Sequence, residues 1–177
     1  MNPTWLRLRP LRREDAPVLS EWGGDSSFCE HTGWTVTSPA ALYTFWLQQV
    51  QDRPDGLMRL AVEDPTIDEL VGYVDLHGSD PGEKELGFVI GPSRRWGQGL
   101  GRRAAEAGLT YGFEELGLEH IWAEALAANT ASVRILRSLG MEETGRGTPG
   151  MFLGEDSYYL QFSISRRAWT HEGDVPS

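Results

Sequence analysis

The glycines that follow residue 95 give the sequence its clearest chemical signal. Three glycines alternate with other residues in Trp96–Gly101, and a helical pattern begins directly afterwards. Because glycine has no side chain, the backbone N–H groups of such a turn can approach a ligand closely. A helix start adds the positive end of its dipole. The segment therefore predicts a pyrophosphate-binding turn, with a glycine turn that binds nothing as the alternative.

Two other phosphate-binding motifs fit this segment less well. A P-loop requires Gly-Lys-Ser or Gly-Lys-Thr after four spacer residues, and the sequence lacks that pattern here. The dinucleotide-binding fingerprint is met formally by Gly99–Ala104, with Glu124 as the residue for the ribose. That fingerprint normally turns directly out of its strand, whereas Gly91–Gln98 separate it from the strand that ends at Ile90. A dinucleotide-binding oxidoreductase is therefore the weaker alternative.

Carboxylates and a histidine on predicted strands are the candidates for acid–base chemistry. Asp75 and His77 share one face of a predicted strand, and Glu85 lies on the next strand on the same face as Gly87. Glu124 lies on a later strand. A general base matters for a lysine-type amine, whose reference pKa is about 10.4, and less for an α-amino group near about 7.7–8.0. Each candidate has a structural alternative as a solvated or ion-paired side chain.

The elements that carry these residues form a mixed α/β (α+β) pattern. Three runs with the alternation of strands, Leu57–Val62, Glu69–Leu76 and Lys84–Ile90, predict an antiparallel meander. A helical stripe follows Gly101 and ends near Gly117. The other predicted elements are a first strand over Thr4–Arg9, helices that begin near Arg13 and Ser38, a strand over His120–Leu126, a helix over Asn129–Leu139, a turn over Gly145–Gly150 and a closing strand over Tyr158–Ile164.

Length and composition predict one compact domain. The chain has 177 residues, of which 40% are hydrophobic, and this is enough for one core. We place the domain at residues 1–167 and a polar tail at residues 168–177. The sequence has no apolar run of about 20 residues that would predict a membrane span. The single cysteine, Cys29, excludes an intramolecular disulfide, so we expect a cytoplasmic protein without a metal site.

The charge of the chain limits its partners. Asp and Glu number 26 against 16 Lys and Arg, which gives a formal net charge of -10. Such a surface repels phosphate backbones and attracts cations. We therefore expect no nucleic-acid partner and favour a cationic one. Three of the tryptophans, Trp34, Trp46 and Trp122, are candidates for an aromatic wall around an amine, with core packing as their alternative role.

Trp96–Gly101 and the residues after it resemble the coenzyme A loop of the GNAT superfamily of N-acetyltransferases. The superfamily pattern has Arg or Gln, two residues, Gly, one residue and then Gly or Ala. Here Trp96 stands at the first position, and glycines occupy the other two. Tryptophan at that position resembles the branch of ribosomal-protein N-terminal acetyltransferases. Asn129–Met141 is similar to the segment that flanks the pantetheine and thiol, and Leu6–Asp15 is similar to the first strand and helix.

The resemblance implies a GNAT-like fold with a mixed, mostly antiparallel, splayed central sheet flanked by helices. It also implies acetyl-CoA as cosubstrate and a primary amine as acceptor, either a protein N-terminus or a cationic small molecule, which attacks directly in a ternary complex. The implied coenzyme contacts are the backbone of Phe88, Val89 and Ile90 for the pantetheine, the amides of Trp96, Gly97, Gln98, Gly99, Leu100 and Gly101 for the pyrophosphate, Arg102 for the phosphates and Asn129 for the pantetheine.

The resemblance implies catalytic roles for two further side chains. Glu85 is the first candidate for a general base that acts on the amine through water. A backbone N–H near Val89 is expected to polarise the thioester carbonyl. Many superfamily members carry a tyrosine that protonates the thiolate, but the matching residue here is Leu136. Ser132, one helical turn earlier, is the candidate replacement, and protonation by water is the alternative.

Because that tyrosine is absent, a protein of another functional class remains an alternative. A coenzyme A binding or sensing module would keep the fold and the glycine turn but would have lost catalysis. Turnover of any amine separates an enzyme from such a module, whereas binding of NAD(P) would favour the oxidoreductase. A homodimer through an exposed closing strand is a further expectation.

Overall fold

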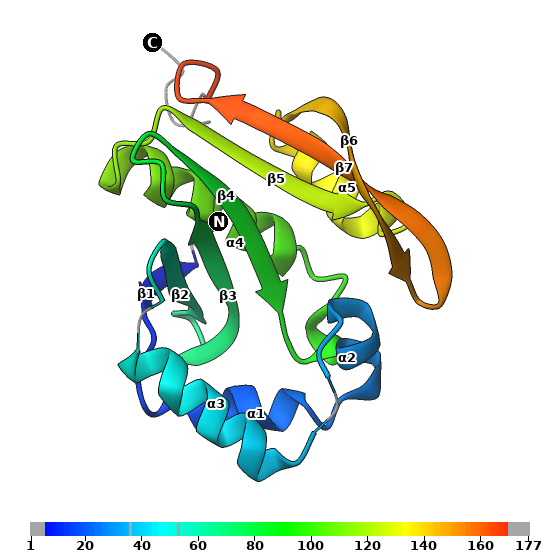
Figure 1. Ribbon diagram of the computed structural model, residues 1–177. Helices are drawn as coiled ribbons and strands as arrows, with labels where there is room; N and C mark the ends of the chain where they lie inside the picture. The colour runs from blue at the N-terminus through cyan, green and yellow to red at the C-terminus, as the bar shows by residue number, and fades with distance from the viewer. Residues whose placement is uncertain (1–5, 36, 53, 170–177) are drawn as a thin grey trace.

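The chain folds around a seven-stranded sheet (Figure 1). The computed structural model describes residues 6–35, 37–52 and 54–169. The strand order is β1-β2-β3-β4-β5-β7-β6, in which β4 and β5 are parallel and the other neighbours are antiparallel. The mixed, mostly antiparallel and splayed sheet predicted from the sequence is thus confirmed. The strands are β1 (Arg7–Pro10), β2 (Leu57–Asp64), β3 (Glu69–His77), β4 (Glu83–Ile90), β5 (His120–Leu126), β6 (Glu142–Phe152) and β7 (Glu155–Ser165).

Helices cover both faces of the sheet. In chain order they are α1 (Asp15–Trp22), α2 (Ser26–Thr32), α3 (Pro39–Gln51), the 3₁₀ turn η1 (Ser93–Arg95), α4 (Leu100–Thr110), the π-helical turn η2 (Tyr111–Glu115) and α5 (Thr130–Ser138). α4 lies behind β4 in Figure 1, whereas α1 and α3 lie together beside β2 and β3.

The face of the sheet under α4 is packed so closely that the helix needs a glycine there. Gly108 faces Leu86 and Val74, and a Cβ atom at Gly108 would lie 2.7 Å and 2.8 Å from their side chains. All three residues are buried. The opposite face carries Ala61 and Tyr73, which pack against α1 and α3 in a second cluster. Alternation along β2, β3 and β4 therefore separates the two cores, as expected for strands buried on both faces.

The edge strand β6 differs from the sequence-based expectation. Gly145–Gly150, predicted as a turn, lies inside β6, which is the edge strand next to β7. The pairing register shifts between Glu143 and Gly145 and again between Arg146 and Pro149. Bulges and a proline are tolerated on an edge because such a strand needs ladder hydrogen bonds on one side. The turn residues therefore mark bulges here, and the strand continues.

The C-terminal end of the packed domain lies beyond the predicted boundary at residue 167. Trp169, which we placed in the polar tail, lies with its ring centroid 6.1 Å from that of Phe113 and so packs on the domain. The start of the predicted first strand at Thr4 and the tail residues 170–177 lie outside the described residues. Within the part of the chain that the structure describes, no helix has the length and apolar character to cross a membrane, and no group of three or more metal-ligating side chains gathers.

Candidate active site

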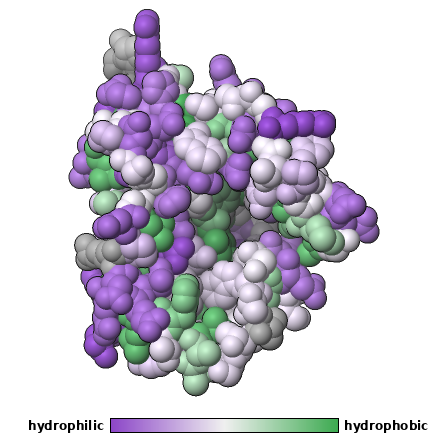
Figure 2. Space-filling view, viewed as in Figure 1, coloured by the Kyte–Doolittle hydropathy of each residue, from purple (hydrophilic) through white to green (hydrophobic). Residues whose placement is uncertain are grey.

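A cavity opens where two neighbouring strands separate. β4 and β5 pair over only three residues, Glu83–Glu85 with His120–Trp122, among the residues described. Beyond that point the two strands diverge (Figure 1). The cavity between them has a volume of about 370 Å³, and Figure 2 shows the same face of the molecule hollowed at its centre. Its walls come from β3, β4, β5, α2, α5 and the β6–β7 hairpin.

The backbone of β4 beyond the last pair faces this opening. The Gly91 N–H donates to the Val71 carbonyl at 3.1 Å, and the register from Gly72 to His77 is continuous. Hydrogen-bonded pairs alternate in an antiparallel ladder. Val89 therefore directs its N–H and C=O toward Tyr73 on β3, while the backbone groups of Phe88 point toward β5.

This geometry corrects part of the predicted coenzyme contacts. The expected pairing with a pantetheine arm can use the backbone of Phe88 and the N–H of Ile90, but not the backbone of Val89. The carbonyl of Ile90 is already engaged, because the indole Nε1 of Trp96 donates to it at 2.8 Å. Val89 nevertheless lines the cavity. A thioester carbonyl would likewise have to be polarised by an N–H of Phe88 or Ile90.

The glycine turn joins η1 to the start of α4. Gly97 and Gly99 both have φ of +76°, and Gly99 caps the helix. The Arg103 N–H donates to the Gly99 carbonyl at 3.2 Å, and the N–H groups in front of a first helical hydrogen bond have no intrahelical acceptor. A Cβ atom at either glycine would meet nothing within 4 Å. The turn therefore offers amides and open space at a positive helix end.

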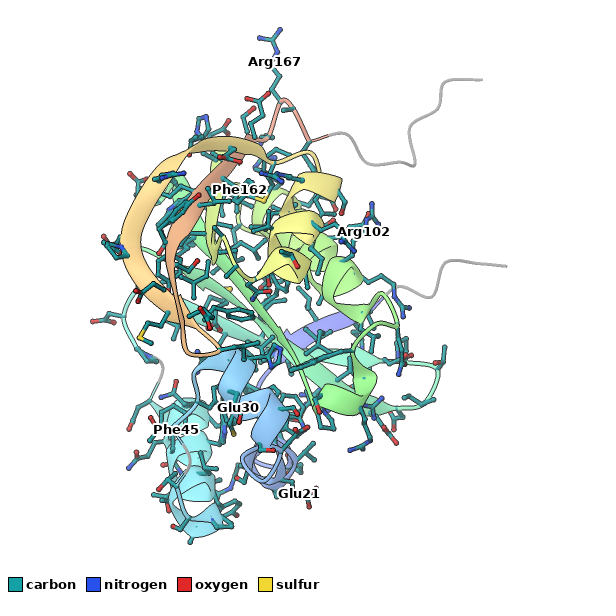
Figure 3. All side chains as sticks on the ribbon, turned by 90° about the vertical axis from the view of Figure 1, so that its right-hand side faces the viewer. Glu21, Glu30, Phe45, Arg102, Phe162 and Arg167 are labelled. Carbon is teal, nitrogen blue, oxygen red and sulfur yellow. The ribbon has the colours of Figure 1, made fainter. Side chains whose placement is uncertain are left out.

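Two of the expected contacts around this turn have other partners. The amide of Trp96 donates to the Ser93 carbonyl at 2.9 Å inside η1, so the available amides begin at Gly97. Arg102 pairs with Glu106 at 3.1 Å one helical turn later. Figure 3 shows Arg102 pointing outward from the start of α4. Its role at the coenzyme phosphates stays a prediction.

Asp25 links η1, the 3₁₀ turn before the glycine turn, to α2, a helix that the sequence analysis did not predict. One carboxylate oxygen of Asp25 accepts from the Phe28 N–H at 3.0 Å and the other from the Ser93 N–H at 2.7 Å. Burial alone would raise the pKa of Asp25, but hydrogen bonds from Ser93 and Phe28 hold it below its usual value. The signal was present in the sequence, because Asp before two serines is a helix cap pattern, but the glycines beside it indicated only a turn.

Glu85 lies at the closed end of the opening, and the cavity begins at the next residue, Leu86. Its carboxylate lies 3.9 Å from Nδ1 of His77, which is long for a hydrogen bond. Burial raises the pKa of Glu85, and the charge of Glu124 raises it further. Glu124 lines the cavity and accepts from Gln161 at 3.4 Å. A carboxyl group with a raised pKa beside a cavity suits a general base.

The start of α5 forms the opposite wall. Asn129 caps the helix, and its Oδ1 accepts from the Ser132 N–H at 3.2 Å. Both residues line the cavity, together with Leu136, which is 1% exposed. The structure therefore brings Asn129 and Ser132 to the same cavity as the open part of β4. Leu136 is apolar and therefore cannot donate a proton to a thiolate in this cavity.

His31 is a further residue that lines the cavity, and no motif in the sequence marks it as a site residue. Its ring lies 4.8 Å from that of Trp96 and 5.5 Å from that of Phe152, measured between centroids. Its Nδ1 lies 2.8 Å from the Ser27 carbonyl, so Nδ1 carries a proton in the neutral ring. These edge-to-face contacts join α2, the glycine turn and the tip of the β6–β7 hairpin, which lies next to α2 in Figure 3.

The interaction between Glu85 and Glu124 gives a testable pH effect. Glu124→Gln is expected to shift the acidic limb of the kcat/KM pH profile to lower pH. The reason is that Glu124 raises the pKa of Glu85, so a neutral amide at position 124 lowers that pKa. Glu119→Gln, with the same change of net charge at an exposed site outside the cavity, should leave the limb in place. An unmoved limb in both variants would remove Glu85 as the titrating group.

Comparisons with known proteins concern the domain as a whole. Residues 6–142 match the family model described as the acetyltransferase (GNAT) domain. The N-acetyltransferase p20 of Bacillus licheniformis, itself uncharacterized, is 28% identical over 144 residues, which are 79% of this chain and 80% of p20. Spermidine N-acetyltransferase from Vibrio cholerae, solved with CoA and spermine, superposes with a TM-score of 0.78 at 21% identity and covers 94% of this chain and 99% of its own.

A second solved structure has the same architecture. The ribosomal-protein-S5-alanine acetyltransferase from Vibrio fischeri superposes with a TM-score of 0.74 at 17% identity, over 97% of this chain and 98% of its own. At these identities the two structural likenesses show the shared fold.

Proposed function

Because the chain belongs to the GNAT acetyltransferase family and is an acetyl-CoA-dependent N-acetyltransferase, we propose that it acetylates a cationic primary amine by direct attack in a ternary complex. The observation that carries this proposal is the opening between β4 and β5, with free amides of the glycine turn at one end and Glu85 at the other. The family excludes the dinucleotide-binding oxidoreductase. The mostly antiparallel sheet agrees, since that motif belongs to parallel sheets.

The coenzyme would lie along the open part of β4. Amides from Gly97 to Gly101 bind the pyrophosphate at the start of α4. The pantetheine pairs with the backbone of Phe88 and the N–H of Ile90 and meets Asn129 on the other side. This path brings the thioester toward Leu86 and Glu85, the closed end of the opening.

The acceptor would enter from the acidic side of the same cavity. Glu30, Asp75 and Glu124 are among the residues that line it, and such a lining attracts an ammonium group. An alkylammonium with a pKa near about 10.4 must lose a proton before it attacks. Glu85 takes that proton through water, and the neutral amine then attacks the thioester carbon. The amide N–H groups of β4 stabilise the oxyanion.

The departing thiolate needs a proton or solvation. Ser132 is the group that we assign to this step, because it lines the cavity one turn before Leu136. Its hydroxyl gives its proton to the thiolate and takes up the proton that the nitrogen of the tetrahedral intermediate releases. Ser132→Ala should lower kcat about tenfold, which is less than the roughly 100-fold lower end for acid catalysis, because water can substitute as donor. The KM for acetyl-CoA should stay unchanged. Ser138→Ala, on the same helix but exposed and outside the cavity, is the matched control. Equal kcat values for both variants would assign the proton to water.

A protein N-terminus is the second candidate acceptor. The Vibrio fischeri relative in fold is a ribosomal-protein-S5-alanine acetyltransferase, and an α-amino group depends less on a base because its pKa is about 7.7–8.0. The acidic lining favours the cationic small molecule.

The proposal is tested in two steps. Thermal unfolding with acetyl-CoA, and with NADH as control, reports coenzyme binding, since a ligand at about 100 times its Kd adds about 2.7 kcal/mol. Release of free thiol is then followed with small amines and with peptides that begin with alanine. Stabilisation by acetyl-CoA and turnover of amines is the expected result. Stabilisation by NADH, or thiol release confined to the peptides, would contradict the proposal.

A further inference from the structure

A second cavity opens next to the first and is lined by aromatic side chains. Its volume is about 420 Å³, and Tyr73 lines both cavities. Trp46 is buried in its wall at the centre of the aromatic cluster, with ring centroids 5.4 Å from Trp34, 5.2 Å from Phe45 and 5.5 Å from Tyr73. Phe45 is 44% exposed, so this wall is open to solvent.

An ion pair separates the two cavities and gives each a different charge. Arg59 donates to both carboxylate oxygens of Asp75, at 2.7 Å and 2.6 Å. Asp75 lines the first cavity, and Arg59 lines the second. The guanidinium of Arg59 lies 5.4 Å from the ring centroid of Trp46 and 4.8 Å from that of Tyr73. The carboxylate therefore faces the ammonium side and the guanidinium faces the aromatic side.

The second cavity is a poor place for a second ammonium group. Among the described residues that line it, none is acidic. Burial raises the pKa of Tyr73 to about 12, so its phenol stays neutral. The guanidinium of Arg59 already occupies the faces of two rings that would otherwise attract a cation. A planar, uncharged aromatic group suits this lining, because rings stack on rings and on guanidinium planes.

We propose that this second cavity is the acceptor subsite for an aromatic ring, so that the acceptor class is an arylalkylamine with one ammonium group. The proposal rests on the function proposed above. The ammonium lies on the acidic side, near Asp75 and Glu124. The ring lies against Trp34, Phe45 and Trp46, and the short alkyl linker passes Tyr73, the residue that the cavities share.

Matched amines test the subsite. We expect kcat/KM for 2-phenylethylamine to exceed that for spermidine by roughly tenfold or more, and that for 2-cyclohexylethylamine by roughly fivefold, from the worth of aromatic contacts. The saturated ring has a similar size but no π face. Higher kcat/KM for spermidine would overturn the subsite, and equal values for the two ring amines would reduce it to an apolar pocket and overturn the aromatic assignment.

Two variants of α3 locate the contact. Phe45→Ala should lower kcat/KM for 2-phenylethylamine about tenfold and leave propylamine and the KM for acetyl-CoA unchanged. Tyr43→Ala is the control, because Tyr43 is 40% exposed on the same helix and lies outside the cavity lining. Equal effects of the two variants would overturn the proposal.

The two proposals fail in different ways. A wild-type protein that acetylates none of these amines contradicts the proposed function, and with it the subsite. A wild-type protein that acetylates spermidine in preference to 2-phenylethylamine keeps the proposed function and contradicts the subsite alone. A third variant, Arg59→Met, should also raise the ratio of spermidine to 2-phenylethylamine turnover, because it removes the positive charge that disfavours a second ammonium group in the second cavity.

Discussion

Gly99→Trp should abolish acetyl-CoA binding and leave the chain folded. A Cβ atom at Gly99 meets nothing within 4 Å, so an indole there enters open space over the amides of the turn and not the core. The φ of +76° adds backbone strain, which costs about 1–2 kcal/mol for a residue with a side chain. The measurement is the thermal shift with acetyl-CoA, which should fall from several degrees to none.

Gly140→Trp separates the loss of a binding site from backbone strain. Gly140 has φ of +77°, its Cβ position is equally open, and it lies at the end of α5 outside the cavity lining. This variant should lose similar stability but keep the full shift with acetyl-CoA. If Gly99→Trp bound acetyl-CoA as tightly as the wild type, our assignment of the pyrophosphate to this turn would be wrong.

Glu85→Gln should lower kcat for a high-pKa amine by about 100-fold or more, the range of general base catalysis. The amide keeps the shape of the side chain but cannot accept the proton. Coenzyme affinity should not change, because the glycine turn lies at the other end of the opening. Glu83→Gln is the control, since Glu83 is exposed, two residues earlier on the same strand and on the same face. The effect should be much smaller for a peptide with a free α-amino group.

The assignment of Glu85 as general base also predicts the direction in which the activity of the wild type changes with pH. A general base works when deprotonated, and burial and Glu124 raise the pKa of Glu85. Activity should therefore be present above that raised pKa and be lost as the pH falls through it, at a higher pH than for an ordinary glutamate. Glu85→Gln should lack this acidic limb. A limb that persists in the variant would belong to another group, and Glu85 would then have a structural role.

Local patterns in the sequence were sufficient for the elements whose residues alternate regularly. β2, β3 and β4 appear close to their predicted bounds because alternation reports burial on a strand. α5 begins after Asn129, as its cap predicted. β6 was missed because glycine and proline usually mark turns, and only pairing with β7 shows that they form bulges. α2 was missed because it has seven residues, too few for a helical period to emerge.

By itself, the sequence determined the glycine turn and the cap of α5, and from them the coenzyme and the family. These signals are local, because each residue type suits the backbone at its own position. Only the tertiary structure decided which side chains share the cavity. Glu124 lies beside Glu85 because β5 pairs with β4 in parallel and then diverges. Arg59 and Asp75 face each other across the pair β2 and β3, and their ion pair forms the wall between the two cavities. Contacts of this kind join residues far apart in the chain, and no local period encodes where two strands part.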